Sequence, residues 1–324
     1  MRTSCDKISV RGKTLKVPSA CIDGRTVIVT GNYIKTAMVK DEDLCDGEAV
    51  ADPELFVKEL KLQNLKADIF TFTQRLAETA RKQLQYVMEW DNAAVIPLTG
   101  YANWWEKRLP QETRRNVRKA AKMGVIVKRV EFDDELVRGI VSIYNETPIR
   151  QGRPFWHYGK DFATVKKENG TYLDRSDFIG AYYNNELIGF IKMVYAEHIA
   201  SIMQILSKNE HYDKRPANAL IAKAVEICDS KGMSSLVYCK YVYGNNDKSP
   251  LTEFKRRNGF SQVLYPRYFV PLTTKGRIVM KLGLHHGLKE LLPERLLTFL
   301  LDLRTQFFEV VNRKRLAREG TTLA

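Results

Sequence analysis

The stretch from Phe178 to Phe260 constrains the fold more than any other part of the sequence. It opens with strand-like runs, FIGAYYNNELIGFIKMVYAEHIASIMQILSK, which carry a turn signal at Asn184-Asn185. A basic, proline-containing loop from Lys208 to Pro216 leads into the helix-like NALIAKAVEICDSKG, and the stretch closes on the strand-like SLVYCKYVY and FKRRNGF. Strands, a phosphate-friendly turn, a helix and a final strand predict an α/β unit with a ligand crevice at the turn.

The net charge of the chain indicates which kinds of partner it is expected to bind. Lys and Arg outnumber Asp and Glu by 52 to 38 among 324 residues, which gives a net charge of +14. This excess favours anionic partners, namely nucleic acid, nucleotide phosphates or an anionic membrane surface, although a basic surface that only aids solubility has the same composition. At about 150 residues per domain, the chain is long enough for two cores.

The cysteines and the first residues predict a cytoplasmic protein. The five cysteines form no CxxC pair and no zinc spacing, and their odd number fits a reducing compartment better than a disulfide framework. The start, MRTSCDKISVRGKTLKV, lacks the apolar core of a signal peptide. No run approaches the roughly 20 apolar residues of a membrane span, so we expect no integral membrane segment.

Residues 1–95 predict a small α+β unit. β-Branched runs at 15–17, 26–30 and 34–39 indicate short strands, and Asp52-Pro53 is typical of a helix start. We expect a buried strand over 67–72, a polar helix over 73–83, and strands over 86–98 around a turn at Asp91-Asn92. No candidate catalytic cluster stands out in these residues.

A basic helix is predicted over Gln111 to Met123. Gly124 suits a left-handed helix stop, and a strand is expected over Val125 to Val130. Arg114, Arg118 and Lys122 follow one another at intervals of four residues and therefore share one face. Because like charges on one face repel each other, the helix gains stability if an anion lies against it; a solvated basic face is the alternative.

The segment 147–160, TPIRQGRPFWHYGK, follows an amphipathic helix predicted over Phe132 to Asn145. It has neither a helical nor a strand period, and it mixes prolines and glycines with cations and aromatic residues. Such a mixture suits a substrate-binding lid, with a merely packed loop as the alternative. His157 alone does not identify a base, because a hydrogen-bonded structural histidine fits the pattern equally well.

Residues 273–324 predict a tail. Helical periodicity from Leu284 to Phe308 is interrupted at Pro293, and LLTFLLDLRTQFF is apolar enough to pack on the body or on a second subunit. The oligomer, if one forms, is therefore expected through these carboxy-terminal helices. The basic end NRKRLAREG is expected to be solvated, with RNA or membrane contact as the alternative.

The hairpin and turn carry a family resemblance. GAYYNNELIGFIKMV resembles the central hairpin of the GNAT acyltransferase fold, and the loop after Lys208 is similar to its pyrophosphate-binding turn. GNAT enzymes usually have Arg or Gln, two residues, Gly, one residue, then Gly or Ala at that turn; here the run is Lys214-Arg215-Pro216-Ala217-Asn218-Ala219. Because Ala217 lacks the backbone freedom of glycine, we expect side chains rather than open amides to hold an anion there.

A branch of that fold, the FemABX-like aminoacyl and peptidyl transferases, resembles the chain over about 95–272. RRNVRKAAKMGV is similar to their Arg-rich helix, RPANALIAKAVEICDSKG to their Pro-Asn helix start, and LTEFKRRNGF to their Phe-Lys motif. The resemblance implies an α/β (α+β) chain with a GNAT-like mixed sheet flanked by helices. It also implies three parts: a reduced GNAT-like half at 1–95, a transferase domain at 96–272 and a helical basic tail at 273–324.

Lys255 is the leading candidate for catalysis. The lysine of the Phe-Lys motif lies in the active site of the transferases that this chain resembles, and a fixed cation stabilises the oxyanion of acyl transfer; a surface lysine before a turn is the alternative. Glu146, Tyr158, His157, Tyr241 and Tyr243 are candidate bases. The expected catalytic set is Lys255, Phe254 and Tyr158, and the expected substrate-binding set is Arg114, Arg118, Arg150, Arg153, Trp156, His157, Lys214, Arg215, Asn218, Arg256 and Arg257.

These residues predict transfer of an acyl or aminoacyl group to an amine by direct attack in a basic crevice. The expected donor substrate is an aminoacyl-tRNA or an acyl-CoA, so tRNA is a possible partner, with no tightly bound cofactor and no metal. An acetyl-CoA-dependent GNAT N-acetyltransferase and a non-catalytic RNA-binding module are the alternatives. The sequence contains no HExxH, Walker or Rossmann motif, which argues against metal, nucleotide-hydrolysing or dinucleotide chemistry.

Overall fold

The computed structural model of the chain describes residues 4–10, 13–45, 48–63, 65–74, 84–244 and 247–286. Twelve strands form one mixed sheet in the order β1-β2-β3-β4-β5-β14-β6-β13-β12-β11-β10-β7, and β8 pairs with β9 separately. The strands are β1 (Ser4–Val10), β2 (Lys13–Ile22), β3 (Arg25–Thr30), β4 (Thr36–Val39), β5 (Ile69–Thr73), β6 (Val87–Pro97), β7 (Ile126–Val130), β8 (Ile149–Arg150), β9 (Arg153–Pro154), β10 (Ser176–Tyr183), β11 (Glu186–Ala196), β12 (Ile199–Ser207), β13 (Ser235–Val237) and β14 (Ser261–Pro271).

Helices cover both faces of this sheet. The α-helices are α1 (Pro53–Leu62), α2 (Tyr101–Asn103), α3 (Gln111–Lys122), α4 (Asp134–Asn145), α5 (Phe162–Asn169), α6 (Pro216–Ser230), α7 (Pro250–Arg257) and α8 (Thr274–Lys281). Shorter helical turns are η1 (Glu42–Leu44), η3 (Trp104–Arg108), η4 (Leu173–Arg175), η5 (Asn209–Lys214) and η6 (Leu284–His286). No helix in these described ranges is long and apolar enough to cross a membrane.

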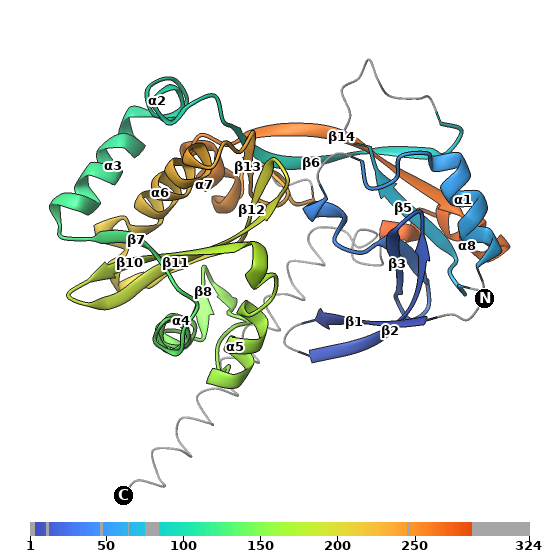
Figure 1. Ribbon diagram of the computed structural model, residues 1–324, viewed down its shortest axis with the longest axis horizontal. Helices are drawn as coiled ribbons and strands as arrows, with labels where there is room; N and C mark the ends of the chain where they lie inside the picture. The colour runs from blue at the N-terminus through green and yellow to red at the C-terminus, as the bar shows by residue number, and fades with distance from the viewer. Residues whose placement is uncertain are drawn as a thin grey trace, which may run out of the picture.

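The long strand β14 joins two halves of the molecule. It pairs with β5 over Arg267–Pro271 and with β6 over Ser261–Phe269, so the chain returns from its second half to complete the sheet of the first. Figure 1 shows β6 and β14 spanning the top of an arch, with β1–β5 below one end and β7 and β10–β12 below the other. The sheet is continuous through residue 95, and the predicted division into parts at 95/96 and 272/273 stays a prediction.

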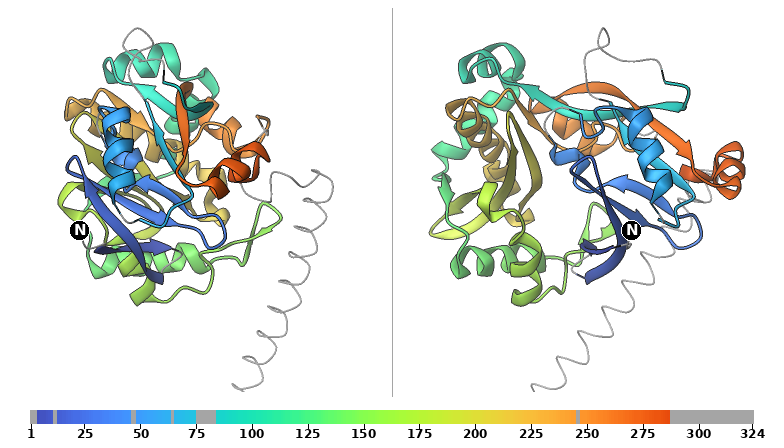
Figure 2. Two further views of the ribbon diagram at one scale, coloured as in Figure 1. Left: turned by 90° about the vertical axis from the view of Figure 1, so that its right-hand side faces the viewer. Right: turned by 45° about the vertical axis from the view of Figure 1, so that its right-hand side comes forward.

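The second half has the layers expected of the predicted fold. An antiparallel array of β10, β11 and β12 packs α3 and α6 on one face and α4 and α5 on the other, as Figures 1 and 2 show. The two faces bury separate apolar clusters, one around Leu220 and Ile191 and the other around Ile140 and Phe190. The predicted mixed sheet flanked by helices is therefore confirmed.

Strands β12 and β13 diverge soon after they pair. They run parallel, and their pairing is confined to Ile199–Ser201 against Ser235–Val237. The sequence predicts a longer strand, SLVYCKYVY, but Cys239 adopts a left-handed conformation (φ 48°), which turns the chain out of the sheet. Ile202–Ser207 consequently has no β13 partner, and a gap opens between the two strand ends.

Two further predictions are corrected. The expected turn at Asp91-Asn92 lies inside β6, a continuous strand, because both residues are bonded to neighbouring segments instead of reversing the chain. The run FKRRNGF is not strand-like at its start but ends α7, because the Ser249 side chain accepts a hydrogen bond from Thr252 N and Pro250 begins the helix. Most of the helix predicted over 73–83, and the tail beyond 286, lie outside the described residues.

Several local predictions are confirmed. The basic helix is α3, and β7 follows it after Gly124, which adopts a left-handed conformation (φ 84°). Asp52 caps α1 by accepting a hydrogen bond from Leu55 N, with Pro53 at the first helical position. The turn at Asn184-Asn185 joins β10 to β11, and both residues have positive φ.

Candidate active site

A cavity of about 950 Å³ lies between the two halves, where β12 and β13 diverge. The second half contributes β12, the segment after β13, the loop after β9 and the end of α5, while the first half contributes β1–β4. The side chains used below are Trp156, His157, Tyr172, Gln204, Tyr238, Cys239, Tyr243 and Asp41. The sequence predicted a crevice at the turn 208–216, but no residue of that turn lines this cavity, which both halves enclose instead.

Lys255 lies directly behind the wall of this cavity. Its side chain has no exposed surface, and its ammonium donates a hydrogen bond to the Lys240 carbonyl. The ammonium also lies 4.6 Å from the ring centroid of Tyr238 and 5.0 Å from that of Tyr243, which are cation–π distances. We call these three groups, the Tyr238 ring, the Lys240 carbonyl and the Tyr243 ring, the Lys255 cage.

Burial changes the ionisation of this site. Desolvation lowers the pKa of Lys255 to about 8, because charging an ammonium away from water is costly. Desolvation also raises the pKa of Tyr238 and the pKa of Tyr243, so both phenols keep their protons at neutral pH. The Tyr243 side chain is hydrogen-bonded to Cys239. Phe254 packs against the α3–α6 core beside Lys255, as the sequence predicts.

His157 lines the cavity but is held on every side. Its Nδ1 lies 3.3 Å from Lys160 Nζ, its Nε2 lies 3.1 Å from Gln204 Nε2, and its ring packs on Tyr144 at 4.1 Å between centroids. Desolvation, followed by the charges of Lys160 and Arg150, lowers the pKa of His157 to about 3. The imidazole is therefore neutral, and it suits shaping of the cavity better than proton transfer.

Trp156 is the exposed aromatic residue of the same loop. Its ring has 56% of its surface exposed and faces the cavity, and Lys160 Nζ lies 3.6 Å from the ring centroid. Lys160 in turn is paired with both carboxylate oxygens of Glu168 on α5, at 2.7 Å each. The loop is thus anchored to α5 while it presents Trp156 to the cavity, as a substrate-binding loop would.

Tyr172 connects the two halves at the cavity. Its hydroxyl donates a 2.7 Å hydrogen bond to Asp41 Oδ1, which follows β4 in the first half. The residues just before Tyr172 are fixed by Lys192, whose buried ammonium donates to Asn169 O, Thr171 O and Thr171 Oγ1 at 2.7, 2.6 and 2.8 Å. Desolvation lowers the pKa of Lys192 to about 8.

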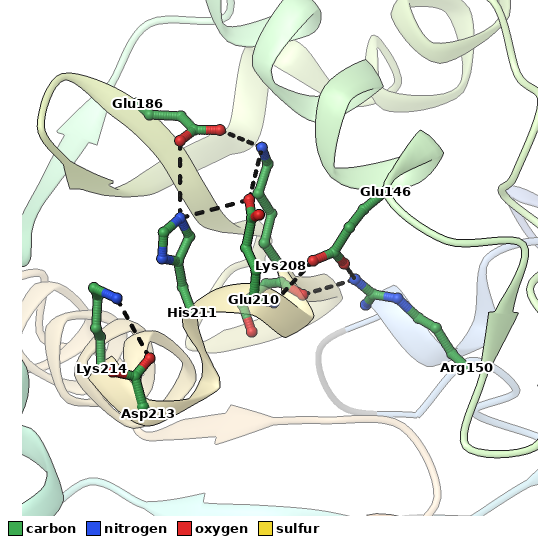
Figure 3. A network of polar contacts seen from close by, with 9 residues as sticks. Glu146, Arg150, Glu186, Lys208, Glu210, His211, Asp213 and Lys214 are labelled. Carbon is green, nitrogen blue, oxygen red and sulfur yellow. Dashed lines mark hydrogen bonds and ion pairs between the residues drawn. The ribbon is translucent and has the colours of Figure 1, made fainter.

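A polar network fixes the turn between β12 and α6 (Figure 3). Lys208 Nζ contacts Glu186 and lies 3.4 Å from Glu210 Oε1, and the Glu210 backbone N–H donates to Glu146 Oε1 at 2.9 Å. The other oxygen of Glu146 accepts from Arg150 Nη2 at 2.9 Å, and Arg150 also donates to Ser207 O at 2.8 Å. Glu146 and Arg150 therefore position this turn, and neither lines the cavity.

Most of the other predicted site residues lie on the α3–α6–α7 side of the second half, whereas Arg153 and Tyr158 lie on β9 and in the loop after it. Arg114 donates to the carbonyls of Trp105 and Glu106, and Arg118 lies over the Trp105 ring. Asn218 at the start of α6 donates to Asn258 Oδ1 at the end of α7, at 3.0 Å.

The cations near α6 and α7 are mostly paired with acidic neighbours. Lys214 Nζ lies 3.4 Å from Asp213, and Arg256 and Arg257 both pair with Glu253. Arg215 is exposed, begins α6 in a left-handed conformation (φ 57°) and precedes Pro216, which has no N–H. Arg153 is exposed on β9, and Tyr158 follows the cavity loop without lining the cavity. Of the predicted site residues, Trp156 and His157 line the cavity and Lys255 backs it.

Sequence reasoning missed Tyr238, Cys239 and Tyr172. The first two were taken as ordinary members of a strand, and nothing in their neighbours signals the left-handed turn at Cys239. Tyr243 was among the candidate bases, and the structure places it in the cavity wall with 47% of its surface exposed. The one available signal was the cluster of tyrosines after a short apolar run, because a buried hydroxyl needs a partner.

Two groups in the described ranges bring histidine and carboxylate atoms within metal-ligand spacing of one another. They are Glu89 with His285 and His286, and Glu186 with Glu210 and His211. In the second group the Lys208 ammonium already lies against both carboxylates, so it balances their negative charge. In the first, both histidines pair with one oxygen of Glu89, at 2.9 and 3.1 Å.

Together these features define a GNAT-type fold in which two α/β halves share one sheet and enclose a cavity. Among solved structures, FemX has a similar arrangement. The crystal structure of FemX is similar over 86% of this chain and 90% of its own, with a TM-score of 0.57 at 9% identity. The predicted GNAT-like fold is thereby confirmed.

Lysylphosphatidylglycerol synthetases share the fold as well. The carboxy-terminal domain of a putative one from Agrobacterium fabrum is similar over 83% of this chain and 88% of its own, with a TM-score of 0.53 at 13% identity. L-PGS from Bacillus licheniformis is similar over 82% and 88%, with a TM-score of 0.51 at 14% identity. No protein-family model and no curated protein sequence matches the chain.

Proposed function

We propose that this chain transfers an activated acyl or aminoacyl group to an amine by direct attack within the cavity between its halves. The observation that carries the proposal is the burial of Lys255 behind Tyr238 and Tyr243, which line the cavity. Burying an ammonium is costly, and a fixed cation beside a cavity stabilises negative charge that develops there. The structural likeness to a putative lysylphosphatidylglycerol synthetase domain, whose name describes an aminoacylated product, supports this class of reaction.

The proposed step is addition followed by elimination. The lone pair of the acceptor amine attacks the donor carbonyl, a carbon–nitrogen bond forms, and the carbonyl oxygen becomes an oxyanion. The bond from that carbon to the ester oxygen or thioester sulfur then breaks, and the amine proton leaves with the departing group or with water. Tyr243 supplies a neutral hydroxyl donor at the oxyanion, and Lys255 behind it supplies positive charge.

The gap between β12 and β13 is the proposed donor site. The backbone of Ile202–Leu206 is not paired with β13, so it is available to an extended ligand. The turn before α6 offers little to a pyrophosphate, since Pro216 has no N–H and the ammonium of Lys214 is paired with Asp213. These contacts favour an aminoacyl-tRNA over an acyl-CoA as the donor.

The test begins with ligand stabilisation. The purified chain is heated with aminoacyl-tRNA or acyl-CoA species, and we expect an aminoacyl-tRNA to raise the melting temperature by mass action. Donors that stabilise the chain are then incubated with amine acceptors, and products are detected by mass spectrometry. Lys255→Met is expected to lower the transfer rate about 100-fold, the scale of losing one preorganised donor.

Glu253→Gln is the matched control, because it changes charge on the same helix but only at the exposed pairs with Arg256 and Arg257. It is expected to transfer at the wild-type rate. The absence of stabilisation and product with every donor, or unchanged transfer by Lys255→Met, would contradict the proposed function.

A non-catalytic RNA-binding role is the second candidate, and the exposed cations Arg115, Lys119 and Lys122 on α3 favour it. Their contacts with phosphates would give a steep fall of affinity with salt. For this candidate, Arg115→Gln with Lys119→Gln lowers RNA affinity and the salt slope while Lys255→Met changes neither. Product formation that depends on Lys255 selects the transferase.

A further inference from the structure

We infer that Asn92, in the middle of β6, is the positioning residue for the Lys255 cage. Where activity is concerned, this inference rests on the proposed function. Asn92 is far from Lys255 in sequence. The inference is tested by the titration of Lys255, which can be measured whether or not transfer occurs.

The Asn92 side chain makes two hydrogen bonds to the backbone of Val242, which lies in the loop 238–243 that carries the Lys255 cage. Its Oδ1 accepts from Val242 N at 2.8 Å, and its Nδ2 donates to Val242 O at 3.3 Å. An amide side chain matches the donor and acceptor of a peptide unit, so Asn92 takes the place of a neighbouring strand at a point where β13 has already ended.

This loop holds every member of the Lys255 cage. Tyr238, the Lys240 carbonyl and Tyr243 fall within six consecutive residues, and Val242 lies next to Tyr243. The beginning of the loop is held on β6 by backbone bonds, from Ala94 N to Cys239 O at 2.9 Å and from Tyr238 N to Ala94 O at 2.8 Å. Asn92 holds its other end, so strand β6 fixes both sides of the cage.

Neighbouring contacts support the same assignment. Asp91 accepts from Lys240 Nζ at 2.9 Å and from Arg267 Nε at 2.8 Å, which ties the residue whose carbonyl receives the Lys255 ammonium to β14. Thr252 Oγ1 on α7 donates to Tyr241 O at 3.3 Å. The loop therefore lies between β6 and α7, and the Asn92 contact decides how closely Tyr243 approaches the ammonium.

If the role of Asn92 were purely structural, its loss would have a different effect on Lys255. Loss of a structural hydrogen bond lowers stability and leaves the surroundings of Lys255 unchanged in the molecules that remain folded. Loss of a positioning contact admits water beside the ammonium, which moves the pKa of Lys255 towards the value of a solvated lysine, about 10.4. The ionisation of one lysine therefore separates the two roles.

The experiment uses the full chain labelled with [ε-¹³C]lysine, with the Lys255 signal assigned by its absence in Lys255→Met. In the wild type we expect this signal to titrate near pH 8. In Asn92→Ala we expect the midpoint to rise by about one pH unit or more. The transfer assay should show a fall in kcat of about tenfold with a smaller change in KM.

Asn145→Ala is the matched control. Asn145 also holds a loop, by accepting from Gly159 N at 2.7 Å and donating to Lys160 O at 3.1 Å, but that loop does not touch Lys255. It should lose comparable stability without moving the Lys255 titration. If Asn92→Ala does not fold, the same titration is measured on Asn92→Ser, because serine cannot make both hydrogen bonds to Val242.

An unmoved Lys255 titration in a folded Asn92 variant overturns the inference. A shifted titration in a chain that transfers no acyl group supports the inference while the proposed function fails, so the two ideas are tested separately. Equal shifts in the Asn92 and Asn145 variants assign the effect to general loosening and also overturn it.

Discussion

The Tyr172 hydroxyl donates a 2.7 Å hydrogen bond to Asp41 Oδ1, and this bond joins the two halves of the molecule beside the cavity. Both residues have left-handed backbones, with φ of 56° and 57°. Such conformations cost free energy in residues other than glycine, so they persist where surrounding contacts hold them. Here Lys192 fixes the segment before Tyr172, and the hydrogen bond to Asp41 holds the two halves together beside the cavity.

Tyr172→Phe removes this bond and keeps the ring. We expect a loss of about 1 kcal/mol in the free energy of unfolding, because one hydrogen bond is lost. We also expect a several-fold rise in KM, since the cavity is lined by both halves. Urea unfolding and steady-state kinetics measure the two effects. Tyr33→Phe, at a tyrosine that is 89% exposed, should change neither, and an unchanged KM in Tyr172→Phe would argue against closure by this contact.

Transfer should fall as the pH rises through about 8. The pKa of Lys255 in the folded chain is about 8, below its ordinary 10.5, so the ammonium loses its proton above that pH. The unfolded chain still holds this proton up to about pH 10.4, so the Lys255 contribution to stability rises between these values while activity declines. A pH–rate profile paired with urea unfolding at each pH tests this, and a rate that climbs above pH 9 would contradict it.

His157 should contribute no inflection to the pH–rate profile between about pH 5 and 8. Its pKa is lowered to about 3, so the imidazole is neutral throughout this range. We expect His157→Gln to raise KM through the altered cavity wall while the shape of the profile stays the same. Disappearance of an acidic limb near neutral pH in this variant would instead identify His157 as a base.

Gly259→Ala should destabilise the end of α7. Gly259 has a φ of 80°, and an added Cβ would lie 2.7 Å from Trp104 Nε1. The left-handed backbone alone costs about 1–2 kcal/mol, and the contact with a buried ring adds to this. Gly283→Ala is the control, because Gly283 has a φ of 67° but open space around its Cβ position. Equal losses from urea unfolding of both variants would show that the backbone conformation accounts for all of the effect.

The sequence predicted elements whose signals lie within a few residues of one another. The hairpin at Asn184-Asn185, the cap at Asp52-Pro53 and the helix stop at Gly124 are fixed by local backbone chemistry, and all three are confirmed. The order of the elements predicted only an α/β unit. The GNAT-like fold was implied by the resemblance of the hairpin, the turn and the Phe-Lys motif to that family. The Ser249-Pro250 helix start was equally local, but it was overlooked beside the apparent strand pattern of FKRRNGF.

The candidate site was predicted in part. Lys255 was selected through its motif, and Trp156 and His157 through their irregular aromatic loop. Trp156 and His157 line one cavity, and Lys255 lies behind its wall. The cations expected to share that crevice instead contact carbonyls, aromatic rings and carboxylates on the α3–α6–α7 side. Positive charge in a sequence indicates an excess of cations, but it does not reveal which acidic or carbonyl partners the fold supplies.

The sequence by itself determined the classes of element, and its family resemblance implied the mixed sheet and the choice of Lys255 as the leading candidate. Only the tertiary structure decided that β13 ends early, that Asp91 and Asn92 lie in a continuous strand, and that Tyr238 and Tyr243 enclose Lys255. The physical reason is distance along the chain: Asn92 and Val242 are separated by 150 residues. Local propensity cannot specify contacts of that range, which arise when β6 and β14 bring the two halves together.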